Sequence, residues 1–521
     1  MRGVLAAVLA VVVLGVFAGP AGASTFSLGP MSTASGASPF PPGCGGAGEA
    51  FDSSVLCQNA EVEPSVAVNP TNPDNIVGFW QQDRWSDGGA HGLLAGVSMD
   101  GGQTWSHSAP KFSRCAGGTG DAGGYHRSSD PWVSFSPNGV VHAISISFDN
   151  DTPRNAVLAS RSADGGQTWS DPAVLRFDNP RALGNNFNDK ESITADPGDS
   201  RLVYAVWDRL VSPSQHSSAR AFERSVSFHG PTWFARSTDN GQSWETARPI
   251  FDPKAINQTI GNQIDVLPDG TLVDGSNLIN GAKNAHGTRG NNVAILRSHD
   301  KGLTWDKKPT IVSSLQTVGV VDPDPNATCP DPEEQGACEV RTGDIIPDFA
   351  VDHSSGTIYT VWHHSRFSGG AHDDIAFSRS TDGGDTWSTP VKVNQTPTDA
   401  AAFTAKTLEN DDGTIAVSYY DFRNDVTATT RSTPTTGWRT RTTEGRRGTS
   451  PRAGSRNARS TCARRRSRSG TSWATTRAWT TRATYSLRSG WPPTTETPRI
   501  ARTRSSGPPD SGLRPPRHGG R

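Results

Sequence analysis

The sequence predicts an all-β protein, a six-bladed β-propeller whose sixth blade is incomplete. Two internal repeats lead to this prediction. An octapeptide of the form Ser-x-Asp-x-Gly-x-Thr/Ser-Trp occurs five times, 61 to 82 residues apart, and a short strand pattern with an adjoining turn occurs six times. Repeats of this kind are typical of β-sheets arranged radially. The octapeptides occupy residues 98–105, 162–169, 237–244, 298–305 and 380–387.

Each octapeptide is expected to form the turn of a β-hairpin. Its Asp accepts backbone N–H groups across the turn, its Gly takes a positive φ, and its Trp folds back as an apolar plug. The repeated strand pattern alternates apolar with small or polar residues, as a sheet packed between neighbouring blades requires. Such innermost strands are expected at residues 64–70, 131–137, 192–197, 263–268, 347–352 and 404–409.

The first 23 residues have the features of a secretory signal peptide. Arg2 precedes an apolar run over residues 4–17, and small residues at 21–23 supply a cleavage site. The apolar run is shorter than a membrane span requires. We therefore expect a secreted, extracellular protein without a membrane span. The chain then divides into an N-terminal extension (24–60), the propeller (61–430) and a tail (431–521).

The tail differs in composition from the rest of the chain. Residues 431–521 contain 21 Arg, no Lys and 3 acidic residues, which leaves 29 basic and 48 acidic residues in residues 1–430. We interpret the tail as a frameshifted translation of a GC-rich gene, because a shifted reading of residues 473–481 permits a sequence typical of a propeller strand. The shift then falls between Asp425 and about Thr433, and no nucleic-acid partner is expected. The alternative is a genuine disordered Arg/Thr/Ser-rich tail that binds nucleic acid or an anionic surface.

The six cysteines fit an oxidising compartment. Cys329 and Cys338 flank one loop and are expected to form a disulfide, whereas Cys44, Cys57 and Cys115 lie toward the first blade. No Cys or His spacing typical of a metal site is present, nor is a nucleotide, haem or redox-cofactor motif.

With its five octapeptides, the chain resembles the sialidase (neuraminidase) superfamily, the BNR or Asp-box repeat proteins, over residues 61–425. Together with the GC-rich codons, this resemblance implies a bacterial protein. It also implies a sialidase-type propeller and a glycoside hydrolase of the exo-α-sialidase type, which acts on terminal sugars of glycans. In that family three arginines bind the substrate carboxylate, an Asp is the acid/base, and a Glu activates a Tyr nucleophile. Val62 stands where the family has its first arginine, so one expected arginine is absent.

Four second strands end in an arginine, and these arginines are candidates for binding an anionic substrate. A guanidinium group forms paired hydrogen bonds with a carboxylate, which sialic acid presents. Arg84 resembles the family's second first-blade arginine. The alternative is that each arginine pairs with a neighbouring Asp or a backbone carbonyl at the rim of a blade. The four are Arg84, Arg209, Arg366 and Arg423.

Asp130 and Glu191 are the candidate catalytic carboxyls, because both stand at the start of an innermost strand. Tyr420, or its neighbour Tyr419, is the candidate nucleophile, with Glu191 as its base. Burial beside other acids would raise a carboxyl pKa and favour acid/base work. The alternative is that these residues line the channel and bond to the backbone.

Three functions compete at this stage. The first is the sialidase-like hydrolase, a monomer that acts on a glycan or glycoconjugate without a cofactor. The second is a non-catalytic propeller that binds glycan or protein at the cell exterior. The third is a scaffold stabilised by Ca²⁺ bound to carboxylates at the channel mouth. The acids at comparable inner positions are Glu63, Asp130, Asp189, Asp265 and Asp348.

Overall fold

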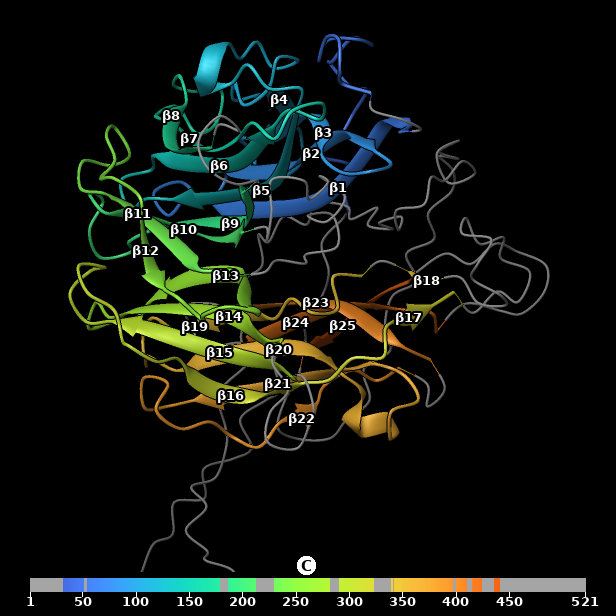
Figure 1. Cartoon of the computed structure of the whole chain (residues 1–521), viewed down its shortest axis with the longest axis vertical. Coiled ribbons are helices and arrows are strands. Elements are labelled where there is room, and N and C mark those ends of the chain that lie inside the picture. Colours follow the sequence, from blue (N-terminus) through green and yellow to red (C-terminus); the bar gives the residue numbers. More distant parts are fainter. Residues whose placement is uncertain are drawn as a thin grey trace, which may run out of the picture.

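The computed structural model describes residues 31–50, 54–178, 186–211, 229–281, 290–322, 339–340, 342–396, 400–409, 415–423 and 435–440. These residues form antiparallel β-sheets and two short 3₁₀ helices, η1 (Gly120–Ala122) and η2 (Ser365–Ser368) (Figure 1). The all-β prediction is therefore confirmed.

The first sheet has eight strands and contains two successive repeats. One backbone pairing, between Ala90 and Ser128, joins the two halves. We call the halves unit 1 and unit 2. Unit 1 consists of β1 (Leu56–Val68), β2 (Ile76–Trp85), β3 (Ala90–Ser98) and β4 (Ser106–Ser108), and unit 2 of β5 (Arg127–Phe135), β6 (Val141–Phe148), β7 (Asn155–Ser162) and β8 (Ala173–Asp178).

Three four-stranded sheets and one three-stranded sheet follow in chain order. Unit 3 is β9 (Asn186–Ala195), β10 (Val203–Val211), β11 (Thr232–Ser237) and β12 (Arg248–Phe251). Unit 4 is β13 (Asn257–Val266), β14 (Leu272–Asn280), β15 (Gly290–Ser298) and β16 (Thr310–Leu315). Unit 5 is β19 (Asp348–Val351), β20 (Ile358–His364), β21 (Asp374–Ser380) and β22 (Val391–Lys392). Unit 6 is β23 (Ala402–Glu409), β24 (Ile415–Asp421) and β25 (Thr435–Thr440), and a separate ladder pairs β17 (Val320–Val321) with β18 (Glu339–Val340).

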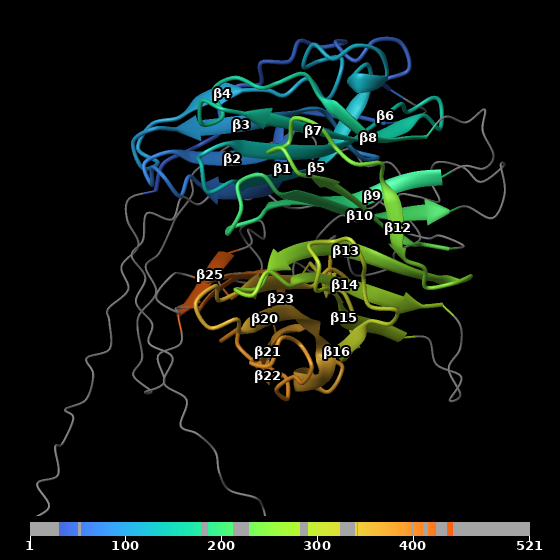
Figure 2. The same cartoon turned by 90° about the vertical axis from the view of Figure 1, so that its left-hand side faces the viewer.

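The first strand of every unit overlaps one of the predicted innermost strands. These strands also contact one another in chain order, β1 with β5, then β9, β13, β19 and β23. Figure 2 shows the sheets following one another from unit 1 to unit 5. Each sheet therefore packs on the next with its first strand on a shared inner side. Closure of a six-bladed ring of sialidase type stays a prediction.

All five octapeptides form the same hydrogen-bonded turn. In the first, the Asp100 carboxylate accepts the backbone N–H groups of Gln103 and Thr104, each at 2.9 Å, and Gly102 has a φ of 85°. In every copy the seventh residue donates its N–H to the Asp, and the fifth donates its N–H to the opening Ser. The octapeptide thus fixes the turn between the third and fourth strands of a unit.

Side chains of the preceding unit hold these turns in place. The Trp169 ring of the second octapeptide stacks on Phe79 of unit 1, with ring centroids 6.2 Å apart. Ser108 of β4 accepts a hydrogen bond from Trp169 Nε1 at 2.9 Å and donates one to the carbonyl oxygen of Gly166. One serine of unit 1 therefore bonds twice to the turn of unit 2.

The N-terminal segment supplies the same contacts to the first octapeptide. Ser32 accepts a hydrogen bond from Trp105 Nε1 at 3.0 Å and donates one to the carbonyl oxygen of Gly102. Ser32 thus makes the same two hydrogen bonds to the first turn that Ser108 makes to the second. A disulfide between Cys44 and Cys115 joins the same segment to the connection between β4 and η1.

Several sequence-based expectations fall on other parts of the chain. Cys57 is also disulfide-bonded, whereas the expected pair Cys329 and Cys338 lies outside the described residues. The signal peptide and residues 441–521 lie outside them as well, so the frameshifted tail stays a prediction. In the part of the chain that the structure describes, no helix has the length and apolar character to cross a membrane.

Candidate functional site

The first strands of units 1, 2 and 3 each contain a β-bulge with one non-glycine residue at positive φ. These residues are Glu63 (52°), Asp130 (53°) and Lys190 (47°). A bulge redirects a side chain, and a non-glycine residue held at positive φ costs about 1 kcal/mol or more. Such strain persists where the surrounding structure enforces it and is typical of functional sites.

The three bulge residues contact one another although they belong to three different units. Lys190 Nζ lies 3.1 Å from Asp130 Oδ1 and 3.5 Å from Glu63 Oε2. Glu63 Oε2 also accepts a hydrogen bond at 2.7 Å from Nε2 of Gln81, and the Gln81 side-chain oxygen accepts one from Arg84. A continuous polar network thus connects the inner edges of units 1, 2 and 3.

The carboxyl groups in this cluster have opposite pKa shifts. Burial alone would raise the pKa of Asp130, but Lys190, Glu63 and Arg84 hold it below its usual range. Burial, reinforced by the charge of Asp130, raises the pKa of Glu191 well above its usual range. The site therefore places a carboxyl group that favours its ionised form beside one that favours its protonated form.

Asp208 of β10 is a third buried carboxyl in this cluster, and the sequence analysis missed it. Burial and the charges of Asp189 and Asp130 raise its pKa well above the usual range. No described side chain donates a hydrogen bond to Glu191 or Asp208; the backbone N–H groups that act on them are that of Gly261 for Asp208 and its own for Glu191. Burial thus favours the protonated form of both acids, and no described side chain is bonded to either.

The structure brings three predicted site residues together, namely Asp130, Glu191 and Arg84. Arg209 lies elsewhere: it pairs with Asp178 of β8, and its guanidinium lies 5.0 Å from the centre of the Trp233 ring. This is the structural pairing that the sequence analysis gave as its alternative.

The other predicted residues belong to units 5 and 6. Arg366 is exposed in η2. Arg423 pairs with Asp421 and donates a hydrogen bond to the Tyr419 hydroxyl at 2.9 Å. Tyr420 of β24 stacks on Phe403, with ring centroids 6.0 Å apart. The catalytic and substrate-binding roles of these residues stay predictions.

Three of the five acidic positions considered for Ca²⁺ already have cationic partners, namely Glu63, Asp130 and Asp348. Lys190 occupies the space between Glu63 and Asp130, and Lys406 Nζ lies 2.7 Å from Asp348 Oδ1. A calcium ion would have to displace an ammonium group at either place, so these residues do not fit a calcium site.

One cluster of potential metal ligands occurs among the described residues, formed by Cys44, His91 and Cys115. The two cysteines form a disulfide with each other. Their sulfur atoms are therefore not thiolates, and the cluster is not a metal site.

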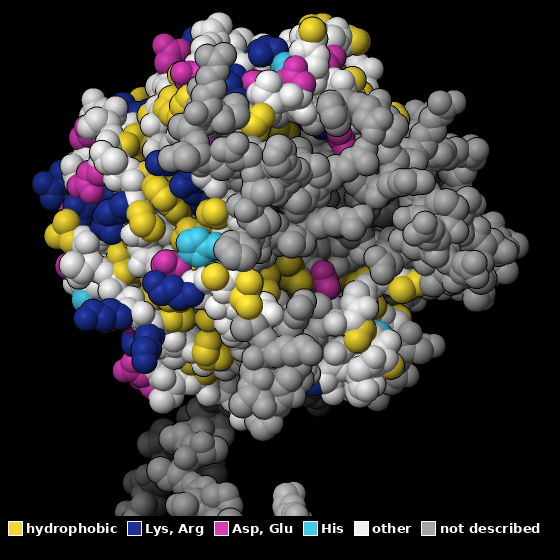
Figure 3. All heavy atoms as spheres, viewed as in Figure 1, with side chains coloured by type: hydrophobic (Ala, Val, Ile, Leu, Met, Phe, Trp, Pro, Cys, Tyr) yellow, Lys and Arg dark blue, Asp and Glu magenta, His cyan; other side chains and the backbone are white. Residues whose placement is uncertain are grey.

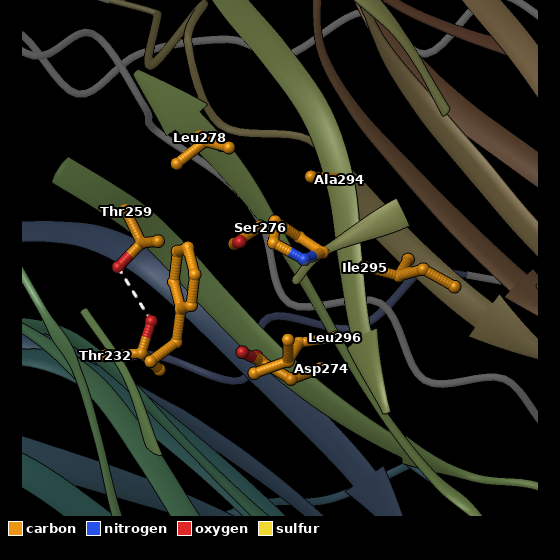
Figure 4. A pocket seen from close by; sticks show the side chains of 10 residues that line it. Thr232, Thr259, Asp274, Ser276, Leu278, Ala294, Ile295 and Leu296 are labelled. Atoms are coloured by element: carbon orange, nitrogen blue, oxygen red, sulfur yellow. Dashed lines mark hydrogen bonds between the residues drawn. The ribbon is translucent and has the colours of Figure 1, made fainter. Parts of the chain in front are cut away.

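A small cavity of about 10 Å³ lies between units 3 and 4 (Figure 4). Its polar side chains are largely paired with one another. The hydroxyls of Thr232 and Thr259 are 2.8 Å apart, and Asp274 accepts a hydrogen bond from Asn262 at 2.8 Å. The bulge residues do not line this cavity, which is therefore separate from the carboxyl cluster.

The face visible in Figure 3 has charged side chains of both signs. Dark-blue Lys and Arg side chains gather on the side where Figure 1 places β11 and β12, but magenta Asp and Glu side chains lie among them. The described part of this face therefore gives no indication of a polyanionic partner.

The described residues thus define an all-β protein of repeated antiparallel sheets, with a carboxyl cluster at the inner edge of units 1 to 3. No known protein family and no curated protein matches the sequence. Among solved structures, the chain is similar to an α-L-arabinofuranosidase of Fusarium graminearum (13% identity, TM-score 0.43, covering 73% of this chain and 93% of that one). It is also similar to a Hadza microbial sialidase (16%, 0.39, 70% and 63%) and to the Trypanosoma rangeli sialidase (13%, 0.40, 71% and 54%). These neighbours are glycoside hydrolases, but at such scores the likeness assigns neither a substrate nor a site residue to this chain.

Proposed function

We propose that the protein is a secreted, sialidase-like glycoside hydrolase that acts on terminal sugars of glycans. One observation carries the proposal: Asp130 and Glu191 share one buried cluster, in which Lys190 lowers the pKa of Asp130 while burial raises the pKa of Glu191. Glycosidases commonly use two carboxyl groups, one ionised and one protonated. Environments that push two carboxyl pKa values apart assign the roles of acid and base.

In the proposed reaction Glu191 is the general acid and Asp130 the general base. Glu191 donates its proton to the glycosidic oxygen as the bond to the leaving group breaks. Asp130 accepts a proton from the water that attacks the anomeric carbon. No described side chain binds either oxygen of Glu191, which is 3% exposed, so the proton of this buried acid is not committed to another side chain. This assignment changes the role of Glu191, which the sequence analysis gave as the base of a Tyr420 nucleophile.

The sialoside version of this proposal depends on Arg84. Its guanidinium is close enough to Asp130 to lower the pKa of that carboxyl. The structure describes all four predicted arginines, and of these Arg84 lies at the carboxyl cluster. A substrate carboxylate bound by Arg84 would place the adjoining anomeric carbon near Asp130 and Glu191. A neutral terminal sugar would use the same two carboxyls without this contact.

The test is turnover of a panel of fluorogenic glycosides that includes a sialoside and an arabinofuranoside. We expect wild-type turnover of at least one glycoside and a loss of about 10²-fold or more in kcat for Asp130→Asn and for Glu191→Gln. Asp265→Asn is the matched control, because Asp265 is a carboxyl on the next first strand whose pKa burial raises to about 7. Equal losses in all three variants would contradict the assignment.

Absence of turnover together with retained binding on a glycan array would replace the hydrolase by the non-catalytic glycan-binding propeller. Binding that Arg84→Ala abolishes for sialylated glycans alone would support the sialoside version.

A further inference from the structure

We infer that Lys190 is a positioning residue that fixes Asp130 as the anionic partner of Glu191, so that the acid and base roles cannot be exchanged. The inference rests on the proposed function, because it concerns the same pair of carboxyls. It adds a residue whose role the sequence pattern did not suggest. It also explains the bulge in β9, because the bulge directs the Lys190 side chain toward Glu63 of unit 1 and Asp130 of unit 2.

Lys190 contacts both oxygens of the Asp130 carboxylate. Its ammonium Nζ lies 3.1 Å from Oδ1, and its backbone N–H donates to Oδ2 at 3.3 Å. One residue therefore fixes the orientation of this carboxylate as well as its charge. The positive φ of Lys190 turns its N–H and its side chain to the same neighbour. An extended residue in a regular strand would present them to different partners.

Two cations, Lys190 and Arg84, act on Asp130 among the charged and titratable groups around it. Arg84 is the second cation, and it is tied to the side-chain oxygen of Gln81. Removal of the Lys190 ammonium would leave several carboxyls around a single guanidinium, and a proton would then move to Asp130. The groups that face this cluster are Glu63 from β1, Arg84 from β2, Asp189, Lys190 and Glu191 from β9, and Asp208 from β10.

The consequence is a specific change in pH dependence. With Lys190 in place Asp130 stays ionised well below neutral pH, so the acidic limb of the kcat/KM profile lies at low pH. Without the ammonium, Asp130 takes up a proton at higher pH. The general base is then lost over the pH interval between the titration of Asp130 in wild type and its titration in the variant. A residue that only stabilised the fold would lower activity equally at all pH values.

The experiment compares pH profiles of kcat/KM for wild type, Lys190→Met and Lys190→Arg on the best glycoside of the panel. We expect the acidic limb of the Lys190→Met profile to move up by at least one pH unit, which is a tenfold loss of kcat/KM at pH values below the limb. We expect Lys190→Arg to have the wild-type limb. Lys406→Met is the matched control, since Lys406 pairs with Asp348 on another first strand, and its limb should not move. An unchanged limb in Lys190→Met, or an equal shift in Lys406→Met, would overturn the inference.

A second measurement separates this inference from the proposed function. If wild type cleaves no glycoside, the proposed hydrolase is wrong, but the carboxyl carbon of Asp130 can still be titrated by ¹³C NMR, with assignment by Asp130→Asn. A titration midpoint raised in Lys190→Met supports the positioning role, and an identical midpoint refutes it. Where Lys190→Met does not fold, Lys190→Gln is measured in the same way, because it removes the charge but keeps a polar side chain.

Discussion

Replacing Ser32 by Ala removes two hydrogen bonds that join the N-terminal segment to the first octapeptide. Trp105 Nε1 loses its acceptor, and the carbonyl oxygen of Gly102, a buried residue, loses its donor. A hydrogen bond of this kind contributes about 1 kcal/mol net, so the free energy of unfolding should fall by about 2 kcal/mol. For a large domain this corresponds to a decrease in Tm of about 2–5 °C.

Thermal unfolding of three variants tests this reasoning. Ser108→Ala removes the same pair of contacts from the second octapeptide and should lower Tm by a similar amount. Thr33→Ala changes an exposed neighbour of Ser32 and should leave Tm unchanged. The reasoning fails if Ser32→Ala behaves like Thr33→Ala while Ser108→Ala is destabilised, because the N-terminal segment would then not hold the first turn as β4 holds the second.

Three further predictions concern other parts of the fold. In Gly384→Ala the new Cβ would lie 2.3 Å from Ile295 Cδ1, whereas in Gly370→Ala, at a similar φ (94° against 91°), it would meet nothing within 4 Å. The first variant should therefore lose about 1–3 kcal/mol more stability in urea unfolding, and equal losses would refute this. Burial raises the pKa of Asp274 to about 8, so the native chain keeps a proton that the unfolded chain releases above about pH 4. Stability should thus fall from about pH 4 to about pH 8, and Asp274→Asn should gain on wild type by up to about 1.4 kcal/mol per pH unit in that window; a constant difference would contradict the shift. Arg423→Ala should lower Tm and leave KM for a sialoside unchanged, because its guanidinium is bound to a neighbouring carboxylate; a raised KM at constant Tm would instead make it a substrate-binding residue.

The sequence predicted the repeated strands because local chemistry determines them. Each octapeptide contains its own turn: the Asp accepts its hydrogen bonds within five residues, and glycines supply the positive φ. The first strands alternate in side-chain character, and all six predicted segments overlap a first strand. The role of Ser32 was not predictable in the same way, because its contacts join residues 70 and 73 positions apart.

The candidate site was predicted in part. Asp130 and Glu191 were found because each stands at the start of a predicted innermost strand; the structure places both inside longer first strands, β5 and β9, in one cluster with Arg84. Arg209 and Arg423 were chosen from the same kind of pattern, yet each pairs with an aspartate near it in space. A strand-end arginine has the same sequence signature whether it binds a ligand or an aspartate, so the pattern alone does not distinguish the two.

Lys190 illustrates a signal that the sequence contains but that periodicity does not reveal. When the first strands are aligned at their bulges, Lys190 occupies the position of Glu63 in unit 1, Asp130 in unit 2, Gly261 in unit 4 and Thr404 in unit 6, and all five have positive φ. Glycine adopts this conformation at little cost, so Gly261 marks the position as one where the backbone requires it. Three units place a charged residue there instead and accept the strain. Because a strained residue persists only where other contacts enforce it, the charged side chains at this position are the ones whose removal should affect the site more than the fold.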